Sequence, residues 1–550
     1  MTDAFPTEVW RLLWKSASRK DWGALSSSCR LFRDICQPFM FRQLVFFTPC
    51  WEEICPTKPE GIISDMQRTL DKLRFFASNP RISQMVDSVA LLLGLEDSEH
   101  VSGFIRLHPN MAQFTSSIGV YTNLSELDIS GFHLTSDFCR TLATLPKFTA
   151  LELDECIINC PEPFDGLALE HFLCQVEGNS DRGCSLVSGS RLQDLILRDP
   201  IPAKAWLTGF VSSGPLPHLV YLNLHLNHEA KDIFFRFLDC CPQLKCIKLQ
   251  APPSFADITL PDTTSPGLLS FKGPIDIAGS FAGGRPVRGF ILDPSGSGSL
   301  ESFGQLVDET VLQKTLLQIA TANATLINLT MPCISLDSSP LCLIAKTFGK
   351  LKQLEFFLRN PDDLEEEDEH FEDPGNDWET VDGLSDGSVD EVLEIDGDTV
   401  EYTLKNVGRD DSNEHEHCDE CMSDCSVGES VTNDDSEFAV NEGTYNDIKL
   451  KSFKDFVRCL ADDLIPLPRN LQVLSIHLFP NLSLSRAREK PMSDADISSV
   501  VTKLGIRYLR LKKVVVESKE RVWRRKGGVW EPPRQRPINP FQVLKQFPLA

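Results

Sequence analysis

The segments LSELDI (residues 124–129), FTALEL (148–153) and LQDLIL (192–197) share one pattern, an apolar residue followed by apolar residues three and five positions later. Five further segments repeat it: LVYLNL (219–224), LKCIKL (244–249), LINLTM (326–331), LKQLEF (351–356) and LQVLSI (471–476). Of the seven intervals between successive segment starts, four are 24, 27, 25 and 25 residues long. A short apolar motif at this period is typical of a repeat architecture with one strand in each unit.

Three weaker segments extend the series. VDSVAL (86–91) and IRYLRL (506–511) read as degenerate copies at the two ends of the array. LLSFKG (268–273) starts 24 residues after Leu244 and fills one of the gaps. We therefore expect strands in these segments as well.

The segments between the strands carry helical patterns. NHEAKDIFFRFLDCCPQ (227–243) places Ile233, Phe234, Phe237 and Leu238 on one helical face before the next strand. Two other linking segments have the same character: TSDFCRTLATLPK (135–147) and LDSSPLCLIAKTFGK (336–350). Each unit is thus a strand followed by a helix, and neither is buried until the next unit stacks on it.

An α/β fold follows, with two interpretations open. One is an ordinary α/β domain built of successive βα units. The near-constant period and the repeated junctions at Pro146, Pro217 and Pro242 favour the other. This is a leucine-rich-repeat solenoid with the strands on its concave side.

The first forty residues have a different pattern, that of short helices. Pro6 suits the first turn of a helix, where its missing N–H costs little, and Glu8 is placed well for the helix dipole. Val9, Leu12 and Leu13 follow as one apolar stripe. Three short helices in about forty residues bury too little apolar surface to be strongly stable alone. We expect such a module to lean on a neighbour or a partner.

Two more helices are predicted in this module. Asp21 is a candidate cap for the second, which carries Ala24 and Leu25. The third is expected to begin near Cys29 and to run as far as a break at Pro38.

The negative charge of the chain is concentrated in one segment. The net charge is −25, yet residues 361–447 hold 32 acidic residues against two basic ones, so this segment carries −30 and the rest carries +5. The segment is also rich in Gly and Ser and poor in aliphatic residues, which predicts disorder. Overall acidity therefore says little about the folded surface.

Targeting signals and disulfide patterns are missing from the sequence. Asp3 and Glu8 occupy the part of the N-terminus that a signal peptide would keep apolar, and no run of 18 apolar residues occurs. The 18 cysteines are scattered and often fall at apolar positions, so we read them as reduced core residues. These features predict an intracellular protein of the cytoplasm, the nucleus or both.

Two candidate sites do not carry a chemical function. HEHCDECMSDC (415–425) offers zinc-type ligands, but no second ligand pair lies at zinc-finger distance, so no metal is predicted. PSGSGS (294–299) matches neither a nucleophile elbow nor a phosphate-binding loop. We therefore predict no enzyme activity, no catalytic residues and no cofactor.

A basic stretch, residues 503–536, contains twelve basic and three acidic residues. ERVWRRKGGVWEPP (520–533) reads as a hairpin that turns at Gly527 and Gly528. Interleaved Arg and Trp would suit nucleic acid. A solvated end of the repeat array is the favoured interpretation.

The opening stretch FPTEVWRLLWKSASRKDWGALSSSCRLFR (5–33), followed by leucine-rich repeats, resembles the F-box proteins, particularly the fungal ones. The family pattern Leu-Pro-x-Glu-Leu/Val is matched by Phe5, Pro6, Glu8 and Val9. Its later part is matched by the following residues: Arg19, Asp21, Leu25, Ser26, Cys29, Arg30, Phe32 and Arg33. The chain departs from the family at Phe5 and Trp22, which replace Leu, and at Ser27 and Ser28, which stand where apolar residues are usual.

The resemblance implies a substrate-recognition subunit of a Skp–cullin–F-box ubiquitin ligase, in which the box docks a Skp-type adaptor and the repeats hold a target protein. The adaptor contacts it implies are Phe5, Pro6, Val9, Leu12, Leu13, Leu25, Cys29 and Phe32. Some of these residues must instead pack the module internally. The alternatives are a leucine-rich-repeat scaffold without a ligase role and an N-terminal segment that only caps the first repeat.

Four regions result from these patterns. We expect an F-box-like helical module at 1–47, a leucine-rich-repeat solenoid at 48–360, an acidic disordered insertion at 361–447, and C-terminal repeats with a basic hairpin at 448–550.

Overall fold

The computed structural model describes the chain from Thr7 to Pro533 with internal gaps, and all of its described elements belong to one compact unit. The described residues are 7–15, 17–48, 59–93, 109–159, 166–175, 186–252, 255, 260–294, 306–322, 325–334, 339–358, 452–478, 492–517 and 521–533. They form a mixed α/β fold around a mostly parallel sheet of 16 strands.

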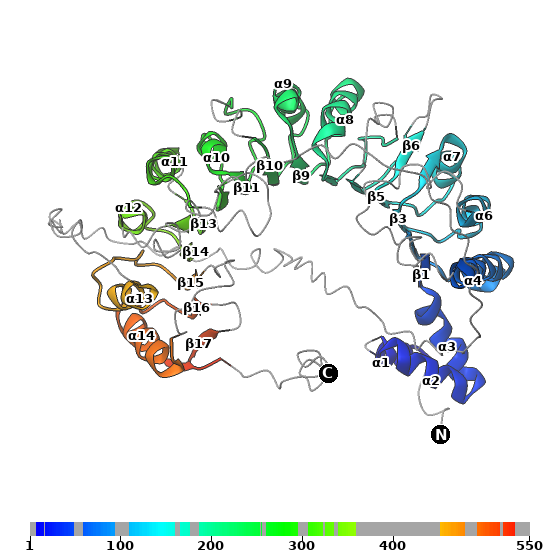
Figure 1. Ribbon diagram of the computed structural model, residues 1–550, viewed down its shortest axis with the longest axis horizontal. Helices are drawn as coiled ribbons and strands as arrows, with labels where there is room; N and C mark the ends of the chain where they lie inside the picture. Colours follow the sequence, from blue (N-terminus) through cyan, green and yellow to red (C-terminus); the bar gives the residue numbers. More distant parts are fainter. Residues whose placement is uncertain are drawn as a thin grey trace, which may run out of the picture. The chain divides into compact units, whose positions relative to one another are not determined.

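Fourteen strands of this sheet run parallel, and each is hydrogen-bonded to the next along the chain (Figure 1). They are β1 (Gln43–Thr48), β2 (Ser88–Leu93), β3 (Glu126–Ser130), β5 (Ala150–Asp154), β7 (His171–Gln175), β8 (Asp194–Leu197), β9 (Tyr221–His225), β10 (Cys246–Gln250), β11 (Ser270–Pro274), β12 (Gly289–Asp293), β13 (Asn328–Ile334), β14 (Gln353–Leu358), β15 (Val473–Leu478) and β16 (Lys513–Glu517). The short strands β4 (His133–Thr135) and β6 (Ile157–Asn159) pair separately.

The register places the second apolar residue of every unit in one continuous column. Each column residue is paired with its equivalent on the next strand, and none is more than 3% exposed. The column consists of Leu44, Val89, Leu127, Leu151, Phe172, Leu195, Leu222, Ile247, Phe271, Phe290, Leu329, Leu354, Leu474 and Val514. Successive side chains of a strand point to opposite faces of the sheet. The apolar residues of each motif therefore lie on the buried face with this column, and the polar residues between them lie on the other face.

The eight strongest segments and the weaker VDSVAL and LLSFKG all form strands that begin two residues into the motif, as predicted. Three strands of the large sheet were missed: β1, β7 and β12 follow the same pattern in FRQLVF (41–46), LEHFLC (169–174) and VRGFIL (287–292). These units were not recognised in the sequence because Phe and Cys replace Leu in their motifs and because their spacing is irregular.

The prediction of a strand in IRYLRL (506–511) is wrong. Ile506 belongs to the helix α14 (Asp494–Arg507), and its side chain is exposed. The strand starts at Lys513, in the overlapping frame LKKVVV (511–516). The helix takes the earlier residues because Ile497, Val501 and Leu504 bury its other face.

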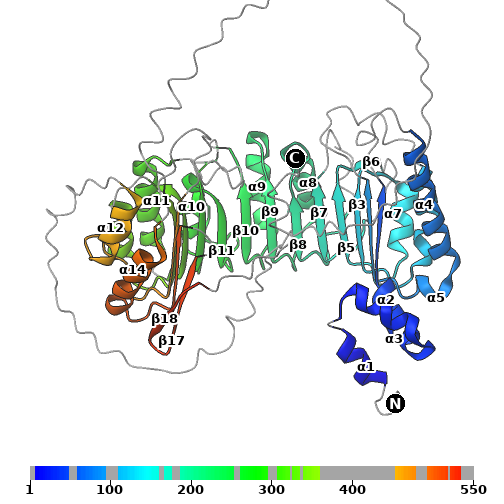
Figure 2. The same ribbon diagram turned by 60° about the horizontal axis from the view of Figure 1, so that its bottom comes forward.

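The connecting helices lie on one side of the large sheet (Figures 1 and 2). They are α4 (Pro59–Ser78), α5 (Pro80–Ser83), α6 (Pro109–Ser117), α7 (Ser136–Ala143), α8 (Pro200–Ser213), α9 (Lys231–Asp239), α10 (Ile275–Ala282), α11 (Glu309–Ala322), α12 (Ser339–Thr347), α13 (Phe453–Ala461) and α14. In α9, Phe234, Phe237 and Leu238 are buried and Ile233 packs at the edge of the core, which confirms the predicted helical face.

The sheet resumes after residues 361–447, which lie outside the described part of the chain. β14 and β15 are adjacent, and six residue pairs join them from Gln353–Val473 to Leu358–Leu478. The prediction that strands before and after this segment belong to one continuous sheet is therefore confirmed. A long insertion between paired strands is tolerable because loop-closure entropy rises only slowly with loop length.

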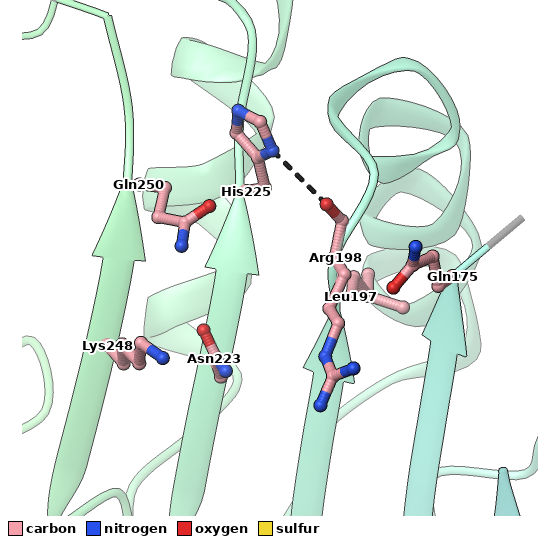
Figure 3. Close-up of a pocket in the computed structure, with 7 residues that line it drawn as sticks. All are labelled: Gln175, Leu197, Arg198, Asn223, His225, Lys248 and Gln250. Carbon is pink, nitrogen blue, oxygen red and sulfur yellow. Dashed lines mark hydrogen bonds between the residues drawn. The ribbon is translucent and has the colours of Figure 1, made fainter. Parts of the chain in front are cut away.

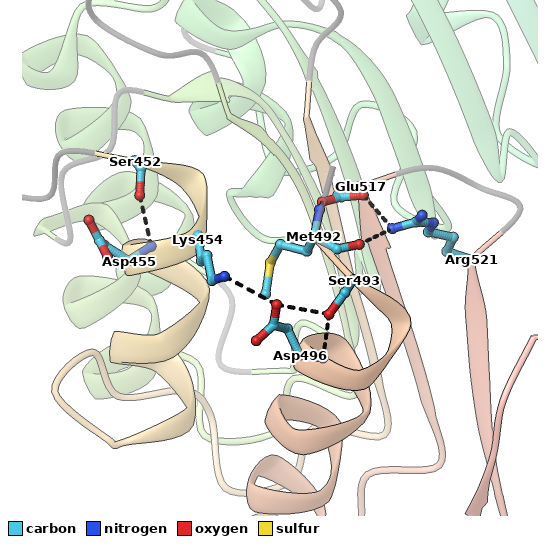
Figure 4. Close-up of polar contacts among 8 residues, drawn as sticks. All are labelled: Ser452, Lys454, Asp455, Met492, Ser493, Asp496, Glu517 and Arg521. Atoms are coloured by element: carbon cyan, nitrogen blue, oxygen red, sulfur yellow. Dashed lines mark hydrogen bonds and ion pairs between the residues drawn. The ribbon is translucent and has the colours of Figure 1, made fainter. Parts of the chain in front are cut away.

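Polar contacts tie together the elements that follow (Figure 4). Lys454 Nζ of α13 lies 3.1 Å from Asp496 Oδ2 of α14. Arg521 donates to Met492 O at 2.8 Å and to Glu517 Oε2 at 2.7 Å, while Glu517 Oε1 accepts from Met492 N–H at 2.7 Å. These bonds fasten the start of α14 to the end of β16.

The predicted C-terminal hairpin is confirmed. β17 (Val522–Lys526) and β18 (Val529–Glu531) are antiparallel and join at Gly527 and Gly528, whose φ angles are 59° and 87°. Two consecutive positive φ angles require the type I′ turn that Gly-Gly favours. Trp523 of β17 is buried against the end of the core, so the hairpin covers the last parallel strand.

The N-terminal helices α1 (Thr7–Trp14), α2 (Arg19–Ser28) and α3 (Arg30–Phe41) form a hydrophobic cluster separate from the main core. Two details correct the sequence analysis. Ser18, rather than Asp21, caps α2, and Asp21 completes a capping box from the third helical position. Pro38 lies inside α3, which continues to Phe41. Packing of Phe39 and Met40 against the module's own cluster offsets the cost of the proline.

Within the described ranges, no helix is long and apolar enough to cross a membrane. The eleven cysteines described are all free thiols, and six of them are buried, as the sequence predicted.

Candidate functional site

The sheet face opposite the helices is lined by the polar positions of the strands. In β9, Leu222 and Leu224 are buried toward the helices, while Tyr221, Asn223 and His225 are half-buried on the other face. The same alternation holds in β7, β8 and β10. We call this surface the open face.

A pocket of about 250 Å³ lies on the open face across four neighbouring strands (Figure 3). Its lining residues are Gln175 of β7, Leu197 and Arg198 at the end of β8, Asn223 and His225 of β9, and Lys248 and Gln250 of β10. His225 Nδ1 lies 3.1 Å from Arg198 O, which links the ends of β8 and β9. We call this site the amide–cation pocket, since amide and cationic side chains make most of its wall.

The electrostatics of this pocket favour anions. Burial lowers the pKa of Lys248, and the nearby cations Lys272 and Arg198 lower it further, against a weaker opposite effect of Asp293. Lys248 and Lys272 are direct register partners on β10 and β11. The Arg198 guanidinium and the Lys248 ammonium make no hydrogen bond or ion pair with the described part of the chain. Like charges held side by side attract anions to the surface.

An ion pair lies on the open face next to this pocket. His171 Nδ1 of β7 is 2.5 Å from Asp194 Oδ2 of β8, and the two residues are register partners. The hydrogen bond that His171 donates to the Asp194 carboxylate raises the pKa of His171, with desolvation acting in the opposite direction. Because the folded-state pKa is raised, this pair stabilises the fold fully below the unfolded-state pKa of about 6.5, and the contribution is lost as pH rises through the folded-state pKa.

Asp194→Asn is expected to lower the pKa of His171, since the variant removes the carboxylate that stabilises the imidazolium. NMR titration of the His171 ring protons measures the change. Asp137→Asn on α7, which removes the same charge from the exposed ion pair with Arg140, is the matched control and should leave the His171 pKa unaltered. An unchanged pKa in Asp194→Asn would show that the carboxylate does not control this histidine.

Some of the residues implied as adaptor contacts pack inside the N-terminal module, and others lie on its surface. Phe32 packs inside, with its ring 5.5 Å from Trp10 and 4.5 Å from Trp14 between centroids. Leu12 points outward and is 74% exposed. Cys29 caps α3, where its sulfur accepts the N–H of Phe32 at 3.4 Å.

The remaining implied contacts are less informative. Val9 is half-buried, and Leu25 is half-buried against the module's own cluster. Phe5, Pro6 and the side chain of Leu13 lie outside the described residues. Ser27 and Ser28 are exposed and donate to the carbonyl oxygens of Ala24 and Leu25.

Three tryptophans hold the module together, and the sequence analysis did not assign this role. Trp10 and Trp14 lie one turn apart on α1, with their rings tilted by 34° and their centroids 5.2 Å apart. Trp22 stacks on Phe39 and donates its indole N–H to Trp14 O at 2.8 Å. The i, i+4 spacing of Trp10 and Trp14 was the available signal for an inward face.

The pocket residues were also missed by the sequence analysis. They occupy the variable positions of the repeat motif, such as Lys248 in LKCIKL, and so carry no pattern of their own. Reading these positions strand by strand would have shown Asn223, Lys248 and Lys272 in one row of the register.

No cluster of metal-ligating side chains occurs within the described ranges, and HEHCDECMSDC (415–425) lies outside them. Comparison of the chain with models of known protein families gave no match, and comparison with curated proteins gave none.

Proposed function

We propose that the protein is the substrate-recognition subunit of a Skp–cullin–F-box ubiquitin ligase. In this proposal α1–α3 are the F-box-like module that docks a Skp-type adaptor. The parallel strands and their helices are a leucine-rich-repeat solenoid that holds a target protein on the open face. The complex would work in the cytoplasm, the nucleus or both.

The observation that carries the proposal is the separate packing of the N-terminal helices. They have their own small core, and α1 leaves Leu12 exposed on its outer side. In this proposal the exposed Leu12 side chain is the apolar contact that the adaptor covers. Residues that resemble the F-box pattern lie in this same module: Val9 and Leu25 in α1 and α2, and Cys29 at the N-cap of α3.

The mechanism proposed is proximity rather than chemistry by this chain. Adaptor and target bound to one chain are held together, so the target meets a ubiquitin-charged enzyme at a raised effective concentration. The protein itself needs no catalytic residue for this role.

Leu12→Asp is expected to abolish capture of a Skp-type adaptor in a pull-down, because it places a charge in an apolar contact. The fold should be unaffected, since Leu12 is 74% exposed in the free chain. Leu509→Asp is the matched control, because Leu509 is 75% exposed in the repeat body. Circular dichroism and thermal melting verify that both variants are folded.

Undiminished capture by Leu12→Asp, or equal loss in both variants, would contradict the proposal. A chain that never captures the adaptor but still binds target proteins would support the second candidate, a repeat scaffold without a ligase role. The amide–cation pocket is compatible with either function, so adaptor capture is the discriminating measurement.

A further inference from the structure

The amide–cation pocket has the chemistry of a site for an extended peptide. Gln175, Asn223 and Gln250 come from three different strands, and each presents an amide that donates and accepts hydrogen bonds (Figure 3). An extended chain has free N–H and C=O groups that pair with such amides. Gln175 and Gln250 lie at one level of the register, and Asn223 lies two residues before that level on a strand between them. Amides from three strands are therefore available to a peptide backbone that crosses the pocket.

The two cations of the pocket stand on alternate strands. Arg198 follows β8 and Lys248 belongs to β10, with β9 and its Asn223 between them. Arg198 follows Leu197, the register partner of Leu224, and so lies level with His225 and Gln250, two residues beyond Lys248. With strands about 4.8 Å apart and a rise of about 3.3 Å per residue, the two residues start about 12 Å apart. This separation suits two anionic groups better than a single one that both cations would have to reach.

The separation also sets the spacing of the anions. In a polyproline II segment the rise is about 3.1 Å per residue with three residues per turn, so side chains three positions apart lie on one side at about 9 Å. This spacing is about 3 Å shorter than the separation of Arg198 and Lys248. The long Arg and Lys side chains can cover the difference, so two carboxylates in an acid-x-x-acid arrangement can contact both cations. Neither cation has an ion-pair partner in the described part of the chain that would have to be displaced.

We infer that the amide–cation pocket binds an extended acidic segment of a partner protein, with two carboxylates three residues apart on Arg198 and Lys248 and the peptide backbone on the amides of Gln175, Asn223 and Gln250. This inference deepens the proposed function by naming the chemistry of the target. Charge complementarity is the reason for choosing an acidic occupant.

The test uses the full chain and fluorescein-labelled peptides of about ten residues in fluorescence anisotropy. The probe has two Glu residues three positions apart in a Gly/Ser/Pro background. Its controls have Gln in place of both Glu residues, or two adjacent Glu residues. The spaced Glu peptide should bind about tenfold more tightly than either control.

Arg198→Gln combined with Lys248→Gln should weaken binding of the probe about tenfold or more, since two charge-assisted contacts are lost. The matched control is Arg236→Gln combined with Lys314→Gln, which removes the same charges from exposed positions on α9 and α11. This control should keep the affinity of the unmodified chain. Equal weakening in both double variants would overturn the site, because it would indicate unspecific attraction.

Other occupants give distinct results that overturn the assignment. Binding of a phosphoserine version alone would indicate a phosphorylated ligand. A tenfold gain in probe affinity when residues 361–447 are replaced by a Gly/Ser linker would indicate that this chain's own acidic segment competes for the pocket.

The Leu12→Asp variant separates this inference from the proposed function. If adaptor capture is lost in that variant while probe binding persists, both are supported. If the unmodified chain captures the adaptor but does not bind the probe, only the inference fails. If it binds the probe but never captures the adaptor, only the ligase role fails.

Discussion

Phe271→Ala is expected to lower the free energy of unfolding by about 3–5 kcal/mol, the usual cost of emptying a fully buried aromatic site. Phe271 is 0% exposed and sits near the middle of the apolar column. Its ring stacks on Phe281 of α10 at 4.5 Å and lies 5.9 Å from Phe290 of β12. The substitution therefore removes contacts to the unit's own helix and to the next strand at once.

The effect should be local as well as large. In the proposed repeat array each unit touches mainly its neighbours, so stability is a sum of local terms and unfolding need not be two-state. Hydrogen exchange of the amides of β10, β11 and β12 should accelerate most, and chemical denaturation should show an earlier transition. Phe75→Ala, at a position 55% exposed on α4, is the control and should change stability by less than about 1 kcal/mol. Equal acceleration in every strand would contradict the stacked-unit account.

Arg285→Leu is expected to lower the free energy of unfolding by about 2–4 kcal/mol, because it removes a charged donor from buried carbonyl acceptors. Arg285 is 4% exposed. Its guanidinium donates to Thr264 O at 2.8 Å, to Pro261 O at 2.6 Å and to Gly283 O at 2.6 Å. It also donates to Ser280 O at 3.2 Å.

These bonds join the turn before β11 to the C-terminal end of α10, so the whole unit depends on one side chain. Burial lowers the pKa of Arg285 and nearby Asp262 raises it, yet the group stays charged at neutral pH. Arg288→Leu is the matched control three residues later, where the side chain is exposed, and should shift the thermal midpoint little. Arg285→Lys should recover only part of the loss, since an ammonium lacks the planar fork that reaches several carbonyls. A midpoint equal to that of the unmodified chain in Arg285→Leu would contradict this role.

The repeat motif alone predicted most of the strands, and the reason is local geometry. In LVYLNL, the buried residues are Leu219, which precedes β9, and Leu222 and Leu224, which lie two residues apart within it. Side chains two residues apart in a strand point to the same face. Gly527 and Gly528 likewise predicted the hairpin, because few other residues take two consecutive positive φ angles. Such features need no knowledge of distant residues.

Tertiary packing decided what local patterns left open. IRYLRL and LKKVVV both fit the motif, and the burial of Leu504 in α14 selected the second frame. On α1, the packing of Phe32 against Trp10 and Trp14 selected the inner face and left Leu12 outside. Periodicity marks the positions that share a face, but it does not say which of two similar faces a neighbour will cover.

The amide–cation pocket and the Arg285 site depend entirely on the tertiary structure. Gln175 and Gln250 are 75 residues apart in the sequence, and only the order and register of β7–β10 bring them to one pocket. Arg285 meets carbonyls of residues 261–264 because the preceding turn folds back beside α10. The sequence by itself determined which residues form the strands and which of their faces is apolar, since both follow from spacing along the chain. Which polar side chains meet on the open face was decided by strand-to-strand pairing, because their proximity is a property of the assembled sheet.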